Sequence, residues 1–350
     1  MKRKLALLLS LVMVLSLLTA CSEDSAKSSR ELPKENNGVS GKTYVIKLAH
    51  VLADSTASAQ ACVYFKELVE ERTNENVEVQ VFSASALGNE RDINENLNNG
   101  SIQMIYSSPG AMGNVFYPEL QVLDAPWLFS SMEQAVAAGR DSNSTIGGFI
   151  KDIYDNTNVQ ILDMWYRAPR HIFTANTKIT TPADCTGLKL RSPEIDVYFG
   201  ALAAIGFSVT PVAYAETYTA IQTGVVEGLE NPFDLCWGMK FQEVTSYCSK
   251  LGWNSGLGPV AINKNFYNSL PEEYQTIISE ATIEAGDYSN KLTIDGDMEL
   301  EQQFIDAGVE MVEPDIAAFK AMLPEIIPQI SDIWNDNGRD IYSQIQSYQA

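Results

Sequence analysis

The chain has 350 residues and is acidic, with 45 Asp and Glu against 24 Lys and Arg, which gives a formal net charge of −21 at pH 7. Nucleic-acid binding needs clusters of Lys and Arg that contact phosphates, so this charge argues against a nucleic-acid partner. The chain has only two histidines, neither near a pair of cysteines, so we expect no zinc site. We also expect no other metal and no cofactor.

The N-terminus has the pattern of a lipoprotein signal peptide. Basic residues 2–4 precede an apolar run at residues 5–18, and small residues lead into Cys21. A run of about fourteen residues is too short to cross a hydrocarbon core of about 30 Å. We therefore predict that residues 1–21 form a signal ending at the lipobox cysteine. Cys21 would then carry the lipid and hold the extracytoplasmic protein at the cell membrane, whereas a membrane anchor or a buried helix is the alternative.

Residues 22–43 are rich in Ser, Glu, Lys, Asn and Gly and contain little that could be buried, which predicts a disordered tether. The residues after the tether suffice for two domains of ordinary size. Four cysteines lie in this part, and both disulfides and buried free thiols are open: their spacing is irregular, although an oxidising compartment would permit bridges. They are Cys62, Cys185, Cys236 and Cys248.

Short apolar runs alternate with helical patterns along the rest of the chain. Strands are predicted at 44–49, 77–82, 102–106, 159–165, 188–191, 207–210 and 225–231. Helices are predicted at 57–72, 89–98, 193–205 and 216–223, and a Thr-capped turn with Pro in its first helical position at 181–184. This alternation predicts an α/β protein with two units, each a mostly parallel sheet flanked by helices.

A long helix is predicted near the C-terminus. Ser269 and Glu272 have the spacing of a capping box, and the helical pattern that follows continues to about Ala307. Gly286 and Gly296 are its weak points, because glycine disfavours a helix interior. A helix of this length suggests an element that spans both domains.

The sequence contains none of the common catalytic motifs, neither GxSxG, HExxH, a GxxxxGK[ST] phosphate loop nor GxGxxG, so we predict that the protein is not an enzyme. Arginines in apolar surroundings are more informative. Arg191 ends a predicted strand, where α/β sheets bind ligands, and its fork of donors matches a carboxylate. For Arg191, a contact with a ligand carboxylate and a structural salt bridge are equally favoured. For Arg170 the structural salt bridge is slightly favoured, and Arg167 is expected to have a structural role.

Two blocks of sequence, TPADCTGLKLR at 181–191 and AYAETYTAIQTGVVEGLENP at 213–232, resemble the substrate-binding proteins of tripartite ATP-independent periplasmic (TRAP) transporters. Shorter matches occur at 87–91, 125–129, 262–264 and 270–274, and the resemblance covers about residues 43–324. Cys185 and Thr186 stand where the family usually has Leu-Lys, and Asn254 where a His is common. These departures bear on the identity of the ligand.

The resemblance implies a two-domain fold like that of periplasmic binding proteins, joined by hinge strands and the long C-terminal helix. Domain I would comprise residues 44–167 and 258–296, and domain II residues 168–257 and 297–350. Ligand would dock on one domain, and the other would close over it.

The resemblance also implies the binding residues. Arg191 would be the principal carboxylate clamp, Asn231 would donate its amide to the same carboxylate, and Arg170 would add a second positive group from across the crevice. Tyr214 would pack on the body of the ligand, with ordinary packing at a helix start as the alternative. The first domain would contribute polar groups from His50, Glu90 and Ser108.

The function implied is capture of a small organic acid and its delivery to the membrane permease subunits of a TRAP-type transporter. The polar groups predicted in the first domain suit hydroxyl groups, so a sugar acid such as a hexuronate is favoured. A C4-dicarboxylate or a keto acid is the alternative ligand. The alternative roles are a sugar-binding protein of an ATP-driven importer and a sensory partner that presents ligand to a receptor.

Overall fold

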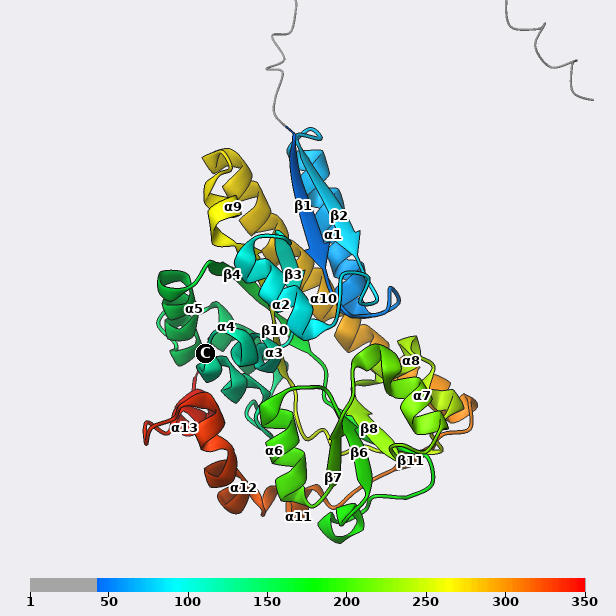
Figure 1. Ribbon diagram of the computed structural model, residues 1–350. Helices are drawn as coiled ribbons and strands as arrows, with labels where there is room; N and C mark the ends of the chain where they lie inside the picture. The colour runs from blue at the N-terminus through cyan, green and yellow to red at the C-terminus, as the bar shows by residue number, and fades with distance from the viewer. Residues whose placement is uncertain (1–42, 350) are drawn as a thin grey trace, which may run out of the picture. The chain divides into compact units, whose positions relative to one another are not determined.

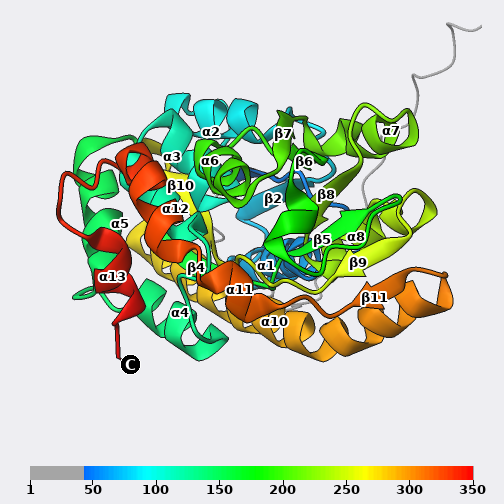
Figure 2. The ribbon, with the colours of Figure 1, turned by 90° about the horizontal axis from the view of Figure 1, so that it is seen from below.

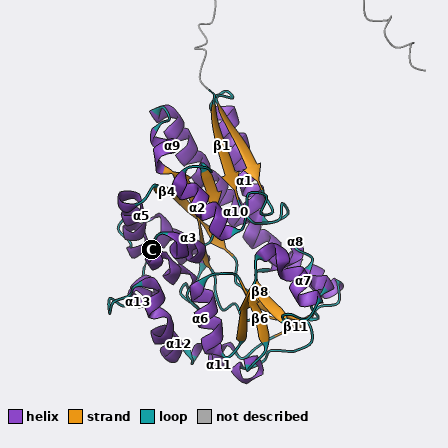
Figure 3. Ribbon diagram, viewed as in Figure 1, coloured by secondary structure: helices purple, strands orange, loops and turns teal. Residues whose placement is uncertain are grey.

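A computed structural model describes residues 43–349 of the chain. The predicted signal peptide, Cys21 and almost all of the predicted tether lie outside the described residues. The described part contains two sheets, one of five strands in the order β2-β1-β3-β10-β4 and one of six in the order β11-β9-β5-β8-β6-β7 (Figure 1). Helices flank both sheets (Figure 3).

The first sheet is built mainly from the N-terminal half of the described chain. Its strands are β1 (Tyr44–Ala49), β2 (Val77–Phe82), β3 (Met104–Tyr106), β4 (Val159–Arg167) and β10 (Gly256–Asn263). Strand β1 is parallel to β2 and β3, whereas β10 runs antiparallel between β3 and β4. The helices that precede β4 in the chain are α1 (Ala57–Arg72), α2 (Glu90–Asn99), α3 (Pro109–Val115), α4 (Met132–Arg140) and α5 (Thr145–Asn156).

The second sheet follows from β5 onward. Its strands are β5 (His171–Thr174), β6 (Lys189–Ser192), β7 (Ser208–Pro211), β8 (Gly228–Asn231), β9 (Tyr247–Ser249) and β11 (Glu310–Val312). Strand β6 lies parallel to β7 and β8, whereas β5 runs antiparallel to β8 and β9. The remaining helices, apart from α10, are α6 (Asp196–Ile205), α7 (Thr217–Gln222), α8 (Phe233–Gly238), α9 (Lys264–Asn268), α11 (Ile316–Lys320), α12 (Leu323–Ile330) and α13 (Ile341–Gln346).

The predicted α/β class, with two sheets flanked by helices, is confirmed. Several elements begin and end where the sequence predicts, because their boundaries carry strong local signals. Helix α1 starts after Thr56, whose side chain accepts a hydrogen bond from the backbone of Ala59, and α2 ends at Gly100 in the left-handed conformation with φ of 85°. Both sheets are mixed, since β10 and β5 each introduce antiparallel neighbours.

Helix α10 (Glu272–Asp306) is 35 residues long and confirms the predicted long helix. It contacts α1 and β4 beside the first sheet, and α8 and β11 beside the second, and Figure 2 shows it running past elements of both. Gly286 is required where α10 lies against β4, because a Cβ there would lie 2.6 Å from the ring of Trp165. Close packing against Trp165 therefore requires glycine at this position, although glycine disfavours a helix interior.

The predicted capping box at the start of α10 is wrong. The Oγ of Ser269 donates to the carbonyl of Phe266 at 2.7 Å, and Pro271 occupies the N-cap position without a side-chain hydrogen bond. Ser269 serves instead as the C-cap of α9, which ends immediately before it.

All four cysteines of the described part are buried free thiols, which settles the alternatives left open by their spacing. Burial raises the pKa of Cys62 and of Cys185, in the latter case to about 12. Within residues 43–349, no helix has both the length and the hydropathy needed to cross a membrane.

Candidate ligand-binding site

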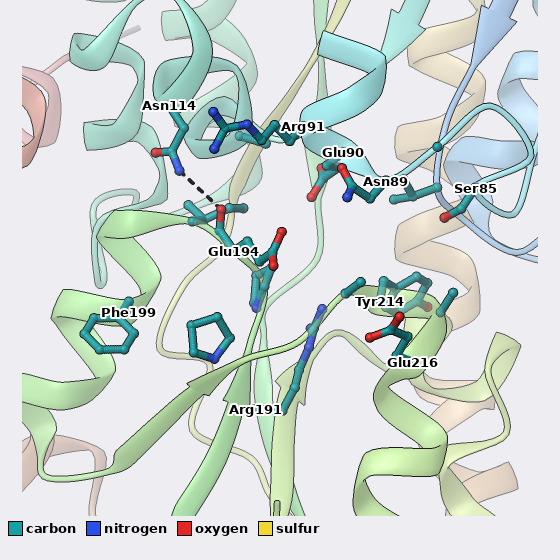
Figure 4. Close-up of a pocket in the computed structure, with 18 of the residues that line it drawn as sticks. Ser85, Asn89, Glu90, Arg91, Asn114, Arg191, Glu194, Phe199, Tyr214 and Glu216 are labelled. Carbon is teal, nitrogen blue, oxygen red and sulfur yellow. Dashed lines mark hydrogen bonds between the residues drawn. The ribbon is translucent and has the colours of Figure 1, made fainter. Parts of the chain in front are cut away.

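A cavity of about 560 Å³ lies between elements that belong to the two sheets. On one side it is lined by Val51, which follows β1, and by the segment 85–91 that leads into α2. On the other side it is lined by the carboxyl end of β6, the start of α6 and the segment 211–216, which begins with the last residue of β7 (Figure 4). Ligands of α/β proteins bind beyond the carboxyl ends of sheet strands, and this cavity has that position.

Arg191 reaches the cavity from β6. The strand pairs Arg191 with Thr210 of β7 and Leu229 of β8, so the residue is held in the interior of the sheet, and it is 2% exposed. Its Nε donates to the carbonyl of Val212 at 2.9 Å. No carboxylate of residues 43–349 forms an ion pair with it. The guanidinium thus faces the cavity without a negative partner (Figure 4).

Burial lowers the pKa of Arg191 to about 10, against an ordinary value of 12.5. The direction of the shift reflects the cost of removing a cation from water. At neutral pH the side chain is still charged, so the cavity contains a permanent, poorly solvated positive group.

Tyr214 lines the same cavity beside Arg191. It opens a short 3-10 helix, Tyr214–Glu216, and its hydroxyl donates to the carbonyl of Leu235 at 2.7 Å. The centre of its ring lies 6.0 Å from Cζ of Arg191, within reach of a cation–π contact. The hydrogen bond to Leu235 thus fixes the orientation of the tyrosine side chain, and its ring forms part of the cavity wall.

Glu90 faces the cavity from the first residue of α2, opposite Arg191 in Figure 4. Its Oε1 accepts hydrogen bonds from the backbone nitrogen and the hydroxyl of Ser108, at 3.0 and 2.9 Å. Ser108 in turn is the N-cap of α3 and lines a smaller adjoining pocket of about 40 Å³, together with Glu90. The structure thus brings Glu90 into the same cavity as Arg191, with Ser108 as its support.

Arg170 is occupied by Glu230. Its Nε forms a buried ion pair with the carboxylate of Glu230, and its Nη2 donates to Oε1 of the same residue at 2.8 Å. Burial favours the neutral form of Arg170, but the charge of Glu230, the neighbouring Tyr198 and the hydrogen bond to Glu230 together outweigh it, so the pKa of Arg170 is raised. The structural salt bridge that the sequence left open is present, and a ligand contact by Arg170 stays a prediction.

Asn231 follows Glu230 at the end of β8 and joins the same network. Its Oδ1 accepts from Nη2 of Arg170 at 2.6 Å, whereas its Nδ2 is buried and has no hydrogen-bond partner in the described chain. A buried amide donor without an acceptor is costly. Neither Asn231 nor Arg170 belongs to the wall of the 560 Å³ cavity, so the predicted amide contact to the ligand stays a prediction.

His50, the residue after β1, is 1% exposed and does not line the cavity, although its neighbour Val51 does. Burial lowers its pKa to about 4, so the ring is neutral at pH 7. Both ring nitrogens lack a hydrogen-bond partner in the described part of the chain. Its predicted contact with ligand also stays untested.

Arg167, for which the sequence predicts a structural role, forms an ion pair with Asp124, 3.1 Å from Nη1 to Oδ1.

Several residues of the cavity wall were not predicted from the sequence. Their signal was position alone, since they follow the ends of β6 and β7 or lie near α2 and α3. They are Ser85, Asn89, Arg91, Asn114, Glu194, Asp196, Phe199 and Glu216.

Comparison with known proteins places the chain in a family. The pattern of bacterial extracellular solute-binding protein family 7 (DctP) matches residues 48–332. The C4-dicarboxylate-binding periplasmic protein DctP of Rhodobacter capsulatus is 30% identical over 289 residues, which are 82% of this chain and 85% of that protein.

Two solved structures share the fold. A TRAP periplasmic solute-binding protein from Bordetella bronchispeptica, with density interpreted as pantoate, superposes with a TM-score of 0.80 at 28% identity, covering 88% of this chain and all of that one. Another from Roseobacter denitrificans, with bound L-galactonate, gives a TM-score of 0.80 at 25% identity, covering 87% and 99%. These proteins are solute-binding proteins rather than enzymes, in agreement with the lack of catalytic motifs in the sequence. The chain therefore belongs to bacterial extracellular solute-binding protein family 7, and its resemblance to the substrate-binding proteins of TRAP transporters is confirmed.

Proposed function

We propose that this protein is an extracytoplasmic lipoprotein that captures a small organic acid through Arg191. It delivers this acid to the permease subunits of a TRAP-type secondary transporter. The observation that carries the proposal is the guanidinium of Arg191, which is buried, charged and without a carboxylate partner among residues 43–349 at the wall of a 560 Å³ cavity.

Electrostatics supports an anionic ligand. A buried charge is normally paired, because an isolated one loses its hydration without compensation. Arg191 uses its Nε on the carbonyl of Val212, which leaves the two terminal nitrogens of the fork for a ligand. A carboxylate accepts two parallel hydrogen bonds from such a fork and neutralises its charge.

The size and the lining of the cavity support a small, hydroxylated acid. Its volume lies within the usual range of small-molecule sites, about 300–1,000 Å³. Oε2 of Glu90 accepts no hydrogen bond from the described chain and offers an acceptor for a hydroxyl group. We therefore favour a sugar acid such as a hexuronate, in keeping with the galactonate bound by the Roseobacter protein. The name of the Rhodobacter relative makes a C4-dicarboxylate the alternative ligand, and a keto acid is the other.

Closure of the two sides of the cavity completes the proposed mechanism. Arg191 and Tyr214 lie on the side of the second sheet and Glu90 on that of the first, so an acid docked on Arg191 contacts both when they approach. Closure removes water, and the attraction between guanidinium and carboxylate strengthens as the local dielectric constant falls.

The experiment is a thermal-shift screen of the purified protein over uronates, aldonates, C4-dicarboxylates and keto acids, followed by calorimetry. A ligand that binds only the folded state raises the melting temperature by mass action. We expect at least one of these acids to bind with a Kd below about 1 µM, equivalent to roughly −8 kcal/mol. Failure of every acid to bind would refute the proposal.

The proposed lipid anchor rests on the signal pattern before Cys21. In cells, the wild-type protein should fractionate with membranes, whereas the Cys21→Ser variant should lose the lipid and leave the membrane fraction or accumulate unprocessed. Mass spectrometry of the N-terminal peptide checks this. An unmodified Cys21 in the wild-type protein would contradict the anchor and leave the binding proposal intact.

A further inference from the structure

The charges around the cavity are unequally distributed. Four of the residues that line it are acidic, and two, Arg91 and Arg191, are basic. Arg91 does not offset the acidic residues in full, because its Nε pairs with Glu95 of the next helical turn at 2.9 Å. Among the described residues, one unpaired cation therefore faces four carboxylates, those of Glu90, Glu194, Asp196 and Glu216.

These carboxylates have little compensation from the protein. Glu194 and Glu216 are exposed at the cavity wall, and no residue within 43–349 forms an ion pair or a side-chain hydrogen bond with either carboxylate. Glu90 accepts two hydrogen bonds from Ser108 on a single oxygen, and its other oxygen accepts none from the described chain. Asp196 has a structural reason for its position, because it lies in the first turn of α6, where a negative charge favours the helix.

In Figure 4, Arg191 enters the cavity on one side and Glu90 lies opposite, with Glu194 at the wall between their levels and Glu216 beside Tyr214, near the guanidinium. A ligand whose carboxylate rests on Arg191 thus directs its other end toward negative groups. Like charges brought together across a binding interface disfavour the wrong partner. Hydroxyl groups or a cationic group at that end would instead meet hydrogen-bond acceptors.

We propose that Glu90, Glu194 and Glu216 restrict the ligand to a single negative charge, so that the site accepts a monocarboxylate with a hydroxylated or cationic far end and rejects the matching dicarboxylate. This inference rests on the proposed function of Arg191 as a carboxylate clamp. It assigns specificity to residues that the clamp itself does not need.

Matched pairs of sugar acids test the inference, because the two members of each pair differ only in whether the terminal CH₂OH is oxidised to a carboxylate. Suitable pairs are galactonate and galactarate, gluconate and glucarate, and erythronate and meso-tartrate. Calorimetry with EDTA present, so that no divalent cation bridges the second carboxylate, gives the ratio of the two Kd values. The wild-type protein should bind the monoacid of every pair that it recognises at least tenfold more tightly than the diacid.

The double variant Glu194→Gln/Glu216→Gln keeps the shapes and removes two charges. The ratio of Kd values should fall at least tenfold in this variant and should also fall in the wild-type protein as salt is raised from 20 to 500 mM, because ions screen partly exposed charges. Glu67→Gln/Glu71→Gln is the matched control, since it removes two exposed charges on α1, outside the cavity wall, and should leave the ratio unchanged.

The outcomes separate the two proposals. If the wild-type protein binds a diacid as tightly as its monoacid, and this binding depends on Arg191, the charge restriction is overturned. The proposed carboxylate clamp is then still supported. The restriction is also overturned if the double variant and the control give the same ratio. If the wild-type protein binds no member of any pair and no other organic acid, the clamp fails, and the restriction fails with it.

Discussion

Replacement of Arg191 by methionine should change binding and stability in opposite directions. Methionine fills much of the volume of the arginine stem but removes the charge and the donors. A hydrogen bond to a charged group contributes about 1.5–3 kcal/mol, so loss of two such bonds from the fork should weaken acid binding by roughly 10²- to 10⁴-fold. Arg191→Lys keeps the charge but not the fork of donors, so its affinity for the acid should lie between that of the wild-type protein and that of Arg191→Met.

The stability of the ligand-free protein should rise in the same variant. Burial lowers the pKa of Arg191 from 12.5 to about 10, and each pKa unit corresponds to about 1.4 kcal/mol, so the charged side chain destabilises the empty protein by about 3.5 kcal/mol. Loss of the charge-assisted hydrogen bond to Val212 removes about 1.5–3 kcal/mol of stabilisation. The free energy of unfolding should therefore increase by about 0.5–2 kcal/mol in Arg191→Met.

Urea unfolding without ligand measures the stability of the three proteins, and calorimetry with the best acid from the screen measures binding. A less stable Arg191→Met protein would show that the guanidinium has a stabilising structural role, against the reasoning from its missing partner. Unchanged affinity would show that the acid binds elsewhere.

Three further predictions follow from buried groups. Glu230→Gln leaves the buried charge of Arg170 without its anion and should lower the free energy of unfolding by about 3–5 kcal/mol in urea titrations, whereas a loss below 1 kcal/mol would contradict the importance of this pair. Burial lowers the pKa of His50 and His171 to about 4 in the folded protein, whereas an exposed histidine has a pKa near 6.5. Between these pH values the unfolded chain binds more protons than the folded protein, so the free energy of unfolding should decrease as the pH falls from 6.5 toward 4. Each histidine should contribute roughly 2 kcal/mol of this loss between pH 7 and pH 5, and His171→Asn should reduce the pH slope accordingly. The four buried thiols should resist iodoacetamide in the native protein and react in urea, as peptide mass spectrometry would show; labelling of the folded protein would disagree with their burial.

Local signals made much of the fold predictable, and their absence explains what was missed. Strand β10 carries two glycines and a proline, residues that weaken a strand pattern, and it was not predicted. Its place depends on distant contacts: a Cβ at Gly258 would lie 2.5 Å from the hydroxyl of Tyr106, so only glycine fits against that ring. Such a requirement is invisible until β3 and β10 are known to be neighbours.

In the site, as in the fold, local signals could be predicted from the sequence and contacts between distant residues could not. The position of Arg191 at the end of a predicted strand was compatible with a ligand contact and with a salt bridge, and the family resemblance favoured the contact. The structure puts Arg191 at the cavity wall. The occupation of Arg170 by Glu230 depends on the pairing of β5 with β8, about sixty residues apart in the chain, and the spacing of residues alone could not reveal it. Glu194 and Glu216 were hidden among many other acidic residues, because only the geometry of the cavity distinguishes them.

The order of strands in the first sheet also bears on how the newly made chain folds. Strands β3 and β4 are not neighbours, since β10 lies between them and is hydrogen-bonded to both. The edge of β3 that faces β10 must wait for residues 256–263, which begin 89 positions after β4 ends. Contacts that link remote segments slow folding, because the intervening chain has to be ordered first. An emerging chain therefore leaves these strand edges unpaired until β10 has been made.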